Sequence, residues 1–368
     1  MSRDDVSPTV LFVDDEQETL TALADQVRSA GANRCEVISP EDLDDDALRS
    51  TDLVVVDFTL DAWIDRIETD VPYLMPINGI ALSAVLREQC HRLDSAPPTG
   101  FALITGKPDA VSSAPGELRP HVIARLSNLE WFFEKQGELE LNVQQIIELA
   151  RAIQGLPAEL SQQLGTLETL LALLGVQTDV LKDRYADAVE RCRPPLHHLS
   201  QQSGGLILLR WLLHRILPHT CFLIDTSTLA ARLRVTPRSL HGELDRASPL
   251  LDALSAYKYT GPLANFDGPR WWRSGVEQWL WEITEGQSAN ADAIYNALFR
   301  VGAVGIQSLN VVRPVVTLDK DLRPEQDLSA RDDVVALHLD DWPSYAEPAY
   351  MRRALLKENS HLKIYEVR

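Results

Sequence analysis

Long apolar runs and targeting segments are absent from this sequence of 368 residues. No stretch of about 18 apolar residues occurs, so the sequence predicts no transmembrane helix. The first residues, MSRDDVSPTVLFVDDE, lack the basic and apolar regions of a signal peptide. We therefore expect a cytoplasmic protein that has no membrane partner.

Cysteine is scarce, and its spacing is uninformative about chemistry. The four cysteines lie far apart and none belongs to a C-x-x-C pair: Cys35, Cys90, Cys192 and Cys221. This usage is typical of reduced thiols in the cytosol. The sequence also lacks a nucleophile elbow, a P-loop, an H-E-x-x-H motif and a glycine-rich dinucleotide motif, which argues against a conventional enzymatic output domain.

Positive charge is in deficit, since 35 basic residues face 54 acidic ones and the net charge is −19. This balance argues against a protein coated in basic surface for nucleic acid or anionic lipid, although a local basic patch remains compatible with it. The first 150 residues hold 28 acids and 11 bases, which leaves 26 acids and 24 bases for the rest. The shift in composition predicts a domain boundary near residue 150.

Before that boundary, short apolar runs alternate with segments of helical periodicity. Strands are predicted at Thr9–Val13, Leu53–Val56, Phe101–Ile104 and Trp131–Phe133, and helices at Gln17–Ala30, Ile80–Leu86, Leu118–Leu129 and Leu141–Ala152. Fully apolar strands that alternate with helices are typical of a parallel sheet covered on both faces. In such sheets, ligands bind at the carboxyl ends of the strands.

Polar residues follow these predicted strands: Asp14, Asp15, Asp57, Thr105 and Lys135. Three carboxylates in one crevice repel each other unless a cation joins them. Oxygen ligands of this kind suit Mg²⁺. A carboxylate can also attack a phosphoryl group, and a metal, an ammonium and a hydroxyl would then stabilise the phosphoryl oxygens. The sequence thus predicts a site for phosphoryl transfer.

The segments FVDDE, LVVVDF, PINGIALSAVLREQ, FALITG and EWFFEK resemble the receiver domain of two-component response regulators. The resemblance covers residues 8–153 and implies a doubly wound parallel sheet of five strands. It also implies a histidine kinase or a phosphotransfer protein as the phosphoryl donor. The chain would then be no enzyme beyond its own Mg²⁺-dependent phosphorylation.

The resemblance assigns roles to single residues. Asp57 would be the phosphoacceptor and would ligate Mg²⁺ together with Asp15 and the backbone carbonyl of Thr59. Asp14 would act on the ion through water. An alternative interpretation of Asp14 and Asp15 is a solvated helix N-cap.

Three further positions complete the family pattern. Thr105 would bind a phosphoryl oxygen and shift inward after phosphorylation, and Lys135 would pair with the phosphate. Phe132 matches an aromatic switch residue; the alternative is that it is simply part of the core. The sequence departs from the family pattern at two places. An insertion, Asp61–Pro76, lies beside Asp57, and Gln136 stands where the family usually has proline.

After the receiver-like part we expect a mainly helical region. Residues 154–215 would be a helical connector. This connector would be either a dimerisation hairpin, which would make the protein a homodimer, or a simple packed linker. Residues 216–300 would form the output domain, and residues 301–368 a small α+β part. The latter contains predicted strands at Val311–Thr317 and Val334–Leu339 and an alternating IYEV pattern at its end.

The segment Thr226–Arg246 has the pattern of a helix-turn-helix. Thr226 or Ser227 would cap the first helix, Thr236 and Pro237 would start the second, and a hairpin over Tyr257–Trp272 would make the domain similar to a winged helix. Three arginines lie where DNA phosphates and bases would be contacted: Arg232, Arg234 and Arg238. The predicted function is a response regulator with a DNA-binding output; the alternative is a signalling adaptor whose output binds another protein.

Overall fold

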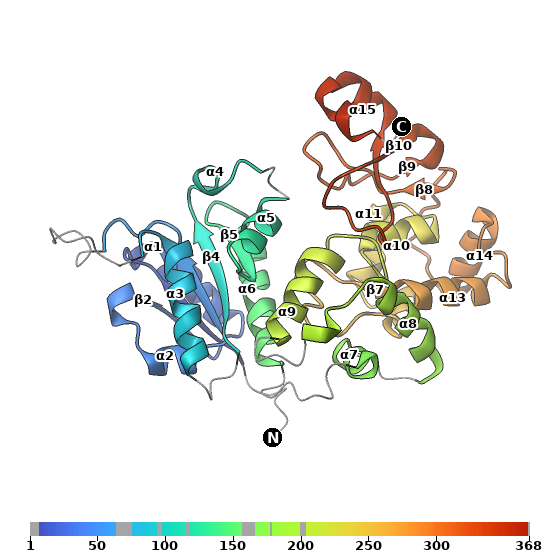
Figure 1. Ribbon diagram of the computed structural model, residues 1–368. Coiled ribbons are helices and arrows are strands. Elements are labelled where there is room, and N and C mark those ends of the chain that lie inside the picture. The colour runs from blue at the N-terminus through green and yellow to red at the C-terminus, as the bar shows by residue number, and fades with distance from the viewer. Residues whose placement is uncertain are drawn as a thin grey trace. The chain divides into compact units, whose positions relative to one another are not determined.

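The structure, a computed structural model, describes residues 7–63, 76–93, 98–114, 116, 118–156, 166–176, 179–198 and 204–366. The chain divides into two compact units (Figure 1). The first consists of Met1–Thr166 and Pro195–His214, and the second of Leu167–Pro194 and Arg215–Arg368. Residues 154–215 are shared between the two units, and the division into four domains stays a prediction.

The first unit is built on one parallel sheet of five strands in the order β2-β1-β3-β4-β5. Its strands are β1 (Thr9–Val13), β2 (Arg34–Ile38), β3 (Leu53–Asp57), β4 (Gly100–Thr105) and β5 (Trp131–Glu134). The sheet confirms the α/β fold predicted for this part of the chain. The sequence analysis located four of the strands but not β2, an edge strand that is partly exposed and carries Glu36 at its centre.

Helices cover both faces of this sheet. Those of the first unit are α1 (Glu18–Ser29), α2 (Asp45–Arg49), α3 (Gly79–Arg92), α4 (Pro108–Val111), α5 (Arg119–Leu126), α6 (Leu139–Gln154) and α9 (Gly204–Trp211), with a 3₁₀ turn η2 (Pro40–Asp42). Leu11 and Val13 of β1 share a core with side chains of α2, α3 and α5. Because side chains alternate along a strand, Val10 and Phe12 face the other side, where α1 and α6 pack against each other.

This strand order places a ligand site between β1 and β3. The chain moves from β1 to one side of the sheet to form β2 and then to the other side to form β3, so the loops after β1 and β3 diverge. The helix α3 comes close to this point: a Cβ on Gly79 would lie 2.1 Å from the backbone oxygen of Asp57. Glycine at the first position of α3 is therefore needed for this close approach.

A buried ion-pair cluster lies at the other end of the sheet. The carboxylate of Glu130, which is 0% exposed, lies 2.9 Å from Nε of Arg210 on α9 and 3.6 Å from Nη2 of Arg87 on α3. It also accepts the backbone N–H of Phe101. Burial raises the pKa of Glu130, but the two arginines and the hydrogen bonds outweigh burial and hold this pKa below its usual range.

The second unit is mostly helical. Its helices are α7 (Leu167–Leu173), α8 (Asp179–Arg191), α10 (Thr226–Leu233), α11 (Pro237–Leu244), α12 (Pro249–Ser255), α13 (Arg273–Ile283), α14 (Ala291–Val301) and α15 (Arg353–Glu358). Three short antiparallel pairs join β6 (Leu223–Ile224) to β7 (Trp271–Trp272), β8 (Pro314–Val315) to β9 (Ser329–Ala330), and β10 (Val334–Leu337) to β11 (Ala349–Arg352).

Two helices, α10 and α11, form at the segment expected to be a helix-turn-helix. The N-cap of α10 is Asp225, whose side chain accepts the N–H of Thr228, rather than the predicted Thr226 or Ser227. Thr236 caps α11 and Pro237 is its first residue, as predicted. Arg234 between the helices adopts a left-handed conformation, with φ of 52°. The winged helix-turn-helix as a whole stays a prediction.

Two predicted local elements of the second unit form only in part. The ends of residues 257–272 pair antiparallel, since Lys258 bridges Trp271 and the N–H of Tyr259 donates to the carbonyl of Arg270 at 2.9 Å, while β7 also pairs with β6. At the end of the described residues the chain forms a 3₁₀ helix, η8 (Ser360–Tyr365), after which Glu366 makes a single antiparallel bridge to Leu337. Within η8, Leu362 packs into a small core with Met351 and Leu356, which favours a helical spacing.

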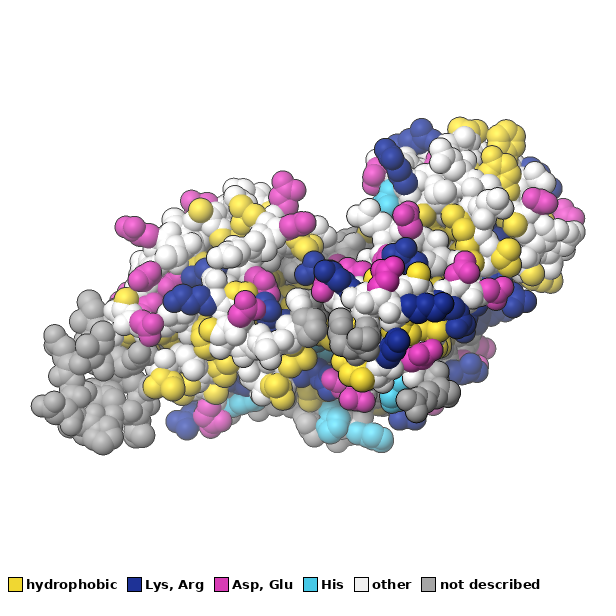
Figure 2. Space-filling view, turned by 90° about the horizontal axis from the view of Figure 1, so that it is seen from above, with side chains coloured by type: hydrophobic (Ala, Val, Ile, Leu, Met, Phe, Trp, Pro, Cys, Tyr) yellow, Lys and Arg dark blue, Asp and Glu magenta, His cyan; other side chains and the backbone are white. Residues whose placement is uncertain are grey.

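The visible face of the molecule mixes charges of both signs. Figure 2 shows basic and acidic side chains interspersed on this face rather than gathered into one broad basic surface. Among the residues that the structure describes, no helix has the length and hydropathy needed to cross a bilayer.

We expect Glu130→Gln to lower the free energy of unfolding by about 3–5 kcal/mol, because the change removes a fully buried charge that pairs with two partly buried arginines. Urea unfolding at pH 7, followed by circular dichroism, measures this loss. The control is Glu36→Gln, whose partner Arg34 is half exposed and whose loss should be about 1 kcal/mol or less. Equal, small losses in both variants would contradict a stabilising role for the cluster.

Candidate functional site

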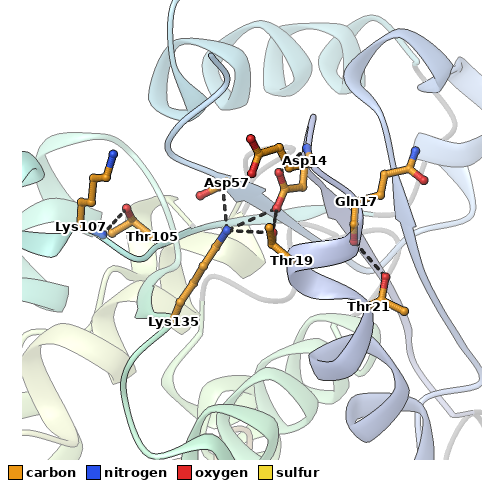
Figure 3. A network of polar contacts seen from close by, with 9 residues as sticks. Asp14, Gln17, Thr19, Thr21, Asp57, Thr105, Lys107 and Lys135 are labelled. Carbon is orange, nitrogen blue, oxygen red and sulfur yellow. Dashed lines mark hydrogen bonds and ion pairs between the residues drawn. The ribbon is translucent and has the colours of Figure 1, made fainter. Parts of the chain in front are cut away.

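The candidate site lies at the carboxyl ends of four neighbouring strands (Figure 3). Asp14 directly follows β1, Asp57 ends β3, Thr105 ends β4 and Lys135 directly follows β5. The register brings the last two together, since Thr105 pairs with Glu134 and its backbone oxygen accepts the N–H of Lys135. The four strands thus position side chains that are up to 121 residues apart in the sequence.

The ammonium group of Lys135 joins two carboxylates. Its Nζ lies 2.9 Å from Oδ2 of Asp57 and 3.3 Å from Oδ2 of Asp14. The two aspartates are buried, whereas the lysine side chain is 22% exposed. One positive charge therefore balances two carboxylates at the switch point of the sheet. Because the lysine side chain is partly exposed, solvent can reach this site.

Thr19, in the first turn of α1, is a member of the site that the sequence analysis missed. Its Oγ1 donates to Oδ2 of Asp14 at 2.5 Å and accepts from Nζ of Lys135 at 3.2 Å. The N–H of Glu16 donates to the other oxygen of Asp14 at 2.9 Å. The position of Thr19 in the sequence could have indicated this role, because its hydroxyl lies five residues after Asp14, where the following helix begins.

Burial is the largest influence on Asp57 and raises the pKa of its carboxyl group. The hydrogen bond and charge of Lys135 oppose this effect, as does the backbone N–H of Thr59, while Asp14 adds to it. The net pKa lies above the ordinary aspartate value. Lys135 therefore favours the ionised form of Asp57, which is the nucleophilic form.

Asp15 is oriented differently from the other two aspartates. Its Oδ2 accepts the backbone N–H of Ala62 at 2.6 Å, at the start of the insertion Asp61–Pro76. Partial burial raises the pKa of Asp15, and the neighbouring charge of Asp14 raises it further. Most of the insertion, residues 64–75, lies outside the described residues, and its role stays open.

The donor chemistry of the site fits a hard cation, because every candidate ligand is an oxygen. The geometry is less complete: within the described ranges, no three histidine, cysteine, aspartate or glutamate side chains converge as metal ligands. Lys135 takes the central place between Asp14 and Asp57, and Asp15 points to a backbone amide. The predicted binding of Mg²⁺ therefore stays a prediction.

Thr105 and Phe132 are both buried. Oγ1 of Thr105 accepts the backbone N–H of Lys107 at 3.0 Å, and the side chain of Lys107 points away from Asp57 (Figure 3). Phe132 is 1% exposed and packs in the core with Leu103. This placement agrees with the core interpretation of Phe132, and the switch role stays a prediction.

The three arginines proposed for DNA have unequal surroundings. Arg232 forms ion pairs with Glu347 and, at 3.8 Å, with Glu277. Arg234 is half-buried between the two helices, and Arg238 is exposed. One of the three thus presents its charge freely on the surface of α11.

The start of α11 is also covered by a later segment of the chain. The backbone N–H of Thr236 donates to the carbonyl of Gln307 at 3.0 Å, and the N–H of Gln307 donates to Oγ of Ser239 at 3.0 Å. The N–H of Leu309 donates to the carbonyl of Arg234 at 2.9 Å. Nothing in the sequence pattern indicates these contacts, because residues 307–309 follow α11 only after three more helices.

No protein-family model matches this sequence, and no curated protein matches it. Among solved structures, the chain is similar to a response regulator protein from Burkholderia pseudomallei, crystallised with a phosphorylated aspartic acid, a calcium ion and citrate. The identity is 17%, the alignment covers 49% of this chain and 92% of that chain, and the TM-score is 0.23. Because so low a score assigns no function, we base the proposals below on the geometry of the site.

Replacing Lys135 by methionine should destabilise the first unit in a pH-dependent way. Without the ammonium, the pKa of Asp57 rises further above its unfolded value, so stability is retained at low pH and lost as the pH rises through this pKa. We expect a loss of about 1.5–3 kcal/mol at pH 7 and a much smaller loss at pH 4.5. Urea unfolding at both pH values measures the difference.

The matched control is Lys107→Met, since Lys107 is exposed and its side chain points away from the site. This variant should unfold like the native protein at both pH values. A loss in Lys135→Met that is equal at pH 4.5 and pH 7 would show that the lysine does not balance the carboxylates.

Proposed function

We propose that the first unit is a phosphoryl-accepting receiver domain and that Asp57 is its acceptor. The observation that carries the proposal is the sharing of one ammonium, that of Lys135, by the buried carboxylates of Asp57 and Asp14 at the switch point of a parallel sheet. A nucleophilic carboxylate with a cation and a hydroxyl nearby is a suitable arrangement for making an acyl phosphate.

In the proposed reaction, an oxygen of Asp57 attacks the phosphorus of a phosphohistidine on a kinase or phosphotransfer protein. The bond between phosphorus and the imidazole nitrogen breaks, and the imidazole takes up a proton as it leaves. Lys135 then exchanges its contact with the carboxylate for one with a phosphoryl oxygen, and the hydroxyl of Thr105 donates to another. The donor keeps no phosphoryl group, and the product is an aspartyl phosphate.

Asp15, Asp57 and the carbonyl of Thr59 would hold Mg²⁺ directly, with Asp14 acting through water. When bound, the ion would supply positive charge that balances the phosphoryl oxygens. For Asp15 to contribute, its hydrogen bond to the N–H of Ala62 would have to be shared or released. This requirement links occupancy of the site to the insertion that begins at Asp61.

Incubation of the full chain with acetyl phosphate and Mg²⁺ should add one phosphoryl group, measured by intact-protein mass. Asp57→Asn should reduce the labelling to background, because an amide is not a nucleophile under these conditions. The control is Asp25→Asn, which removes an exposed carboxylate of α1 that is 61% exposed and should label like the native chain. Equal labelling of Asp57→Asn would refute the assignment.

For the second unit, we infer an output that binds another protein in preference to DNA. Two observations favour this choice over the DNA-binding output that the helix-turn-helix pattern suggests. Arg232 is already paired with two glutamates, and residues 307–309 are bonded to the start of α11. DNA affinity depends largely on free cations that neutralise phosphates, and the residues after position 150 hold no excess of them, with 26 acids against 24 bases.

Binding of the phosphorylated full chain to sheared genomic DNA, measured over a range of salt concentrations, separates the two outputs. We expect weak binding, with a slope of log affinity against log salt no steeper than about −2. The variant Arg238→Ala should leave this binding almost unchanged. A slope of about −5, as for six phosphate contacts, together with a loss in Arg238→Ala, would instead assign a DNA-binding output.

A further inference from the structure

A groove on the second unit lies outside the candidate site described above. Its walls are α11, the residues directly after this helix, and Gly305 and Gln307, which follow α14. Its volume is about 270 Å³, close to the lower end of the range of about 300–1,000 Å³ that is ordinary for small-molecule sites. The groove therefore has room for one small ligand.

A buried carboxylate, that of Glu243, lines this groove and keeps one oxygen without a partner. The residue is 1% exposed. Its Oε1 accepts the backbone N–H of Gly305 at 2.8 Å and a second hydrogen bond from Nη2 of Arg246. Its Oε2 is buried too, and no hydrogen-bond donor among the described residues reaches it. A buried acceptor without a donor costs free energy, so this atom is suited to a donor that a ligand brings.

Two glycines shape the groove in different ways. A Cβ on Gly305 would clash with Oε1 of Glu243, so glycine is needed for the N–H of residue 305 to reach the carboxylate. Gly242 lies inside α11, and a Cβ there would have no atom of the described chain within 4 Å. Glycine inside a helix is less favourable than alanine, and no close contact requires it here. The missing side chain leaves the groove open beside Glu243.

The charges of the groove favour an anion. Arg238 is exposed and lies four residues before Gly242, on the same face of α11. The side chain of Arg246 is 55% exposed and already pairs with Glu243. Two guanidinium groups therefore accompany one carboxylate, and the charge of Arg238 remains available. Arginine is well suited to bind phosphate, because its planar group offers several donors at once.

We propose that this groove binds a nucleoside monophosphate whose base carries an amino group. The phosphate would contact Arg238, the base would lie over Gly242, and the amino group would donate to Oε2 of Glu243. Five residues separate Arg238 from Glu243, or about 7.5 Å along the helix axis. A nucleotide can span this separation, whereas inorganic phosphate cannot.

A zwitterionic amino acid of similar size suits the groove less well. Its ammonium would bring a second cation to Glu243, whose charge Arg246 already balances. Its net charge of zero would also leave the excess positive charge of the groove in place. A neutral N–H donor combined with a phosphate meets both requirements.

Calorimetric titration of the full chain without Mg²⁺ tests the proposal. The probes are the 5′-monophosphates of adenosine, guanosine and cytidine, and we expect at least one of them to bind with a stoichiometry of one. Its nucleoside, which lacks the phosphate, and its analogue with two methyl groups on the amino nitrogen should each bind at least about ten times more weakly. A factor of this size is typical of one lost hydrogen bond to a charged group.

Three variants place the binding in the groove. Gly242→Leu should fill the space beside Glu243 and weaken binding at least about tenfold, while its urea midpoint should not fall, because leucine favours a helix. The matched control is His241→Leu, at the neighbouring exposed position of α11 that does not line the groove, and it should bind like the native chain. Arg238→Gln should weaken nucleotide binding by a similar factor and leave nucleoside binding unchanged.

Several results would overturn the proposal. These are no binding of any of the three nucleotides at about 1 mM, equal affinity for the dimethylated analogue, and unchanged affinity in Gly242→Leu or Arg238→Gln. Circular dichroism of each variant separates a loss of binding from a loss of folding. Labelling of Asp57 by acetyl phosphate is a separate measurement, so the nucleotide site can fail while the proposed receiver function stands.

Discussion

The shared ammonium of Lys135 is the interaction on which the first unit depends. Two carboxylates, Asp14 and Asp57, end neighbouring strands with little solvent to screen them, and each would oppose the ionisation of the other. The ammonium of the lysine balances both negative charges, at 2.9 Å from the carboxylate of Asp57 and 3.3 Å from that of Asp14. The partial exposure of the lysine keeps the site accessible. A balance of this kind is easily altered by a new anion, because any phosphoryl group on Asp57 would compete for the same ammonium.

The positions of these side chains at strand ends could be predicted from the sequence, because strand ends are local features. Four apolar runs, each followed by a polar residue, located Asp14, Asp57, Thr105 and Lys135, and the parallel topology placed them together. Thr19 was missed because its role depends on how α1 begins relative to Asp14. The orientation of Asp15 was also missed, since its partner is the backbone of Ala62, and backbone amides leave no pattern in a sequence.

The second unit was harder to predict, because its contacts are between segments that are distant in the chain. The caps of α11 were correct, as they depend on Thr236 and Pro237 alone. The expected free arginine Arg232 is paired with Glu347, 115 residues away. Counting charges in the sequence treats every arginine as available, so it overestimates the positive charge that a partner would meet.

Helix α3 connects the site to the buried charges at the other end of the sheet. Its first residue, Gly79, lies against the backbone of Asp57, and its N–H donates to the carbonyl of Phe58 at 3.0 Å. Eight residues later, or about 12 Å along the helix axis, Arg87 lies 3.6 Å from the carboxylate of Glu130. The same carboxylate holds Arg210 of α9. Because separating a buried carboxylate from its arginines is costly, Glu130 holds α3 and α9 to the same end of the sheet, while the start of the same α3 lies against Asp57.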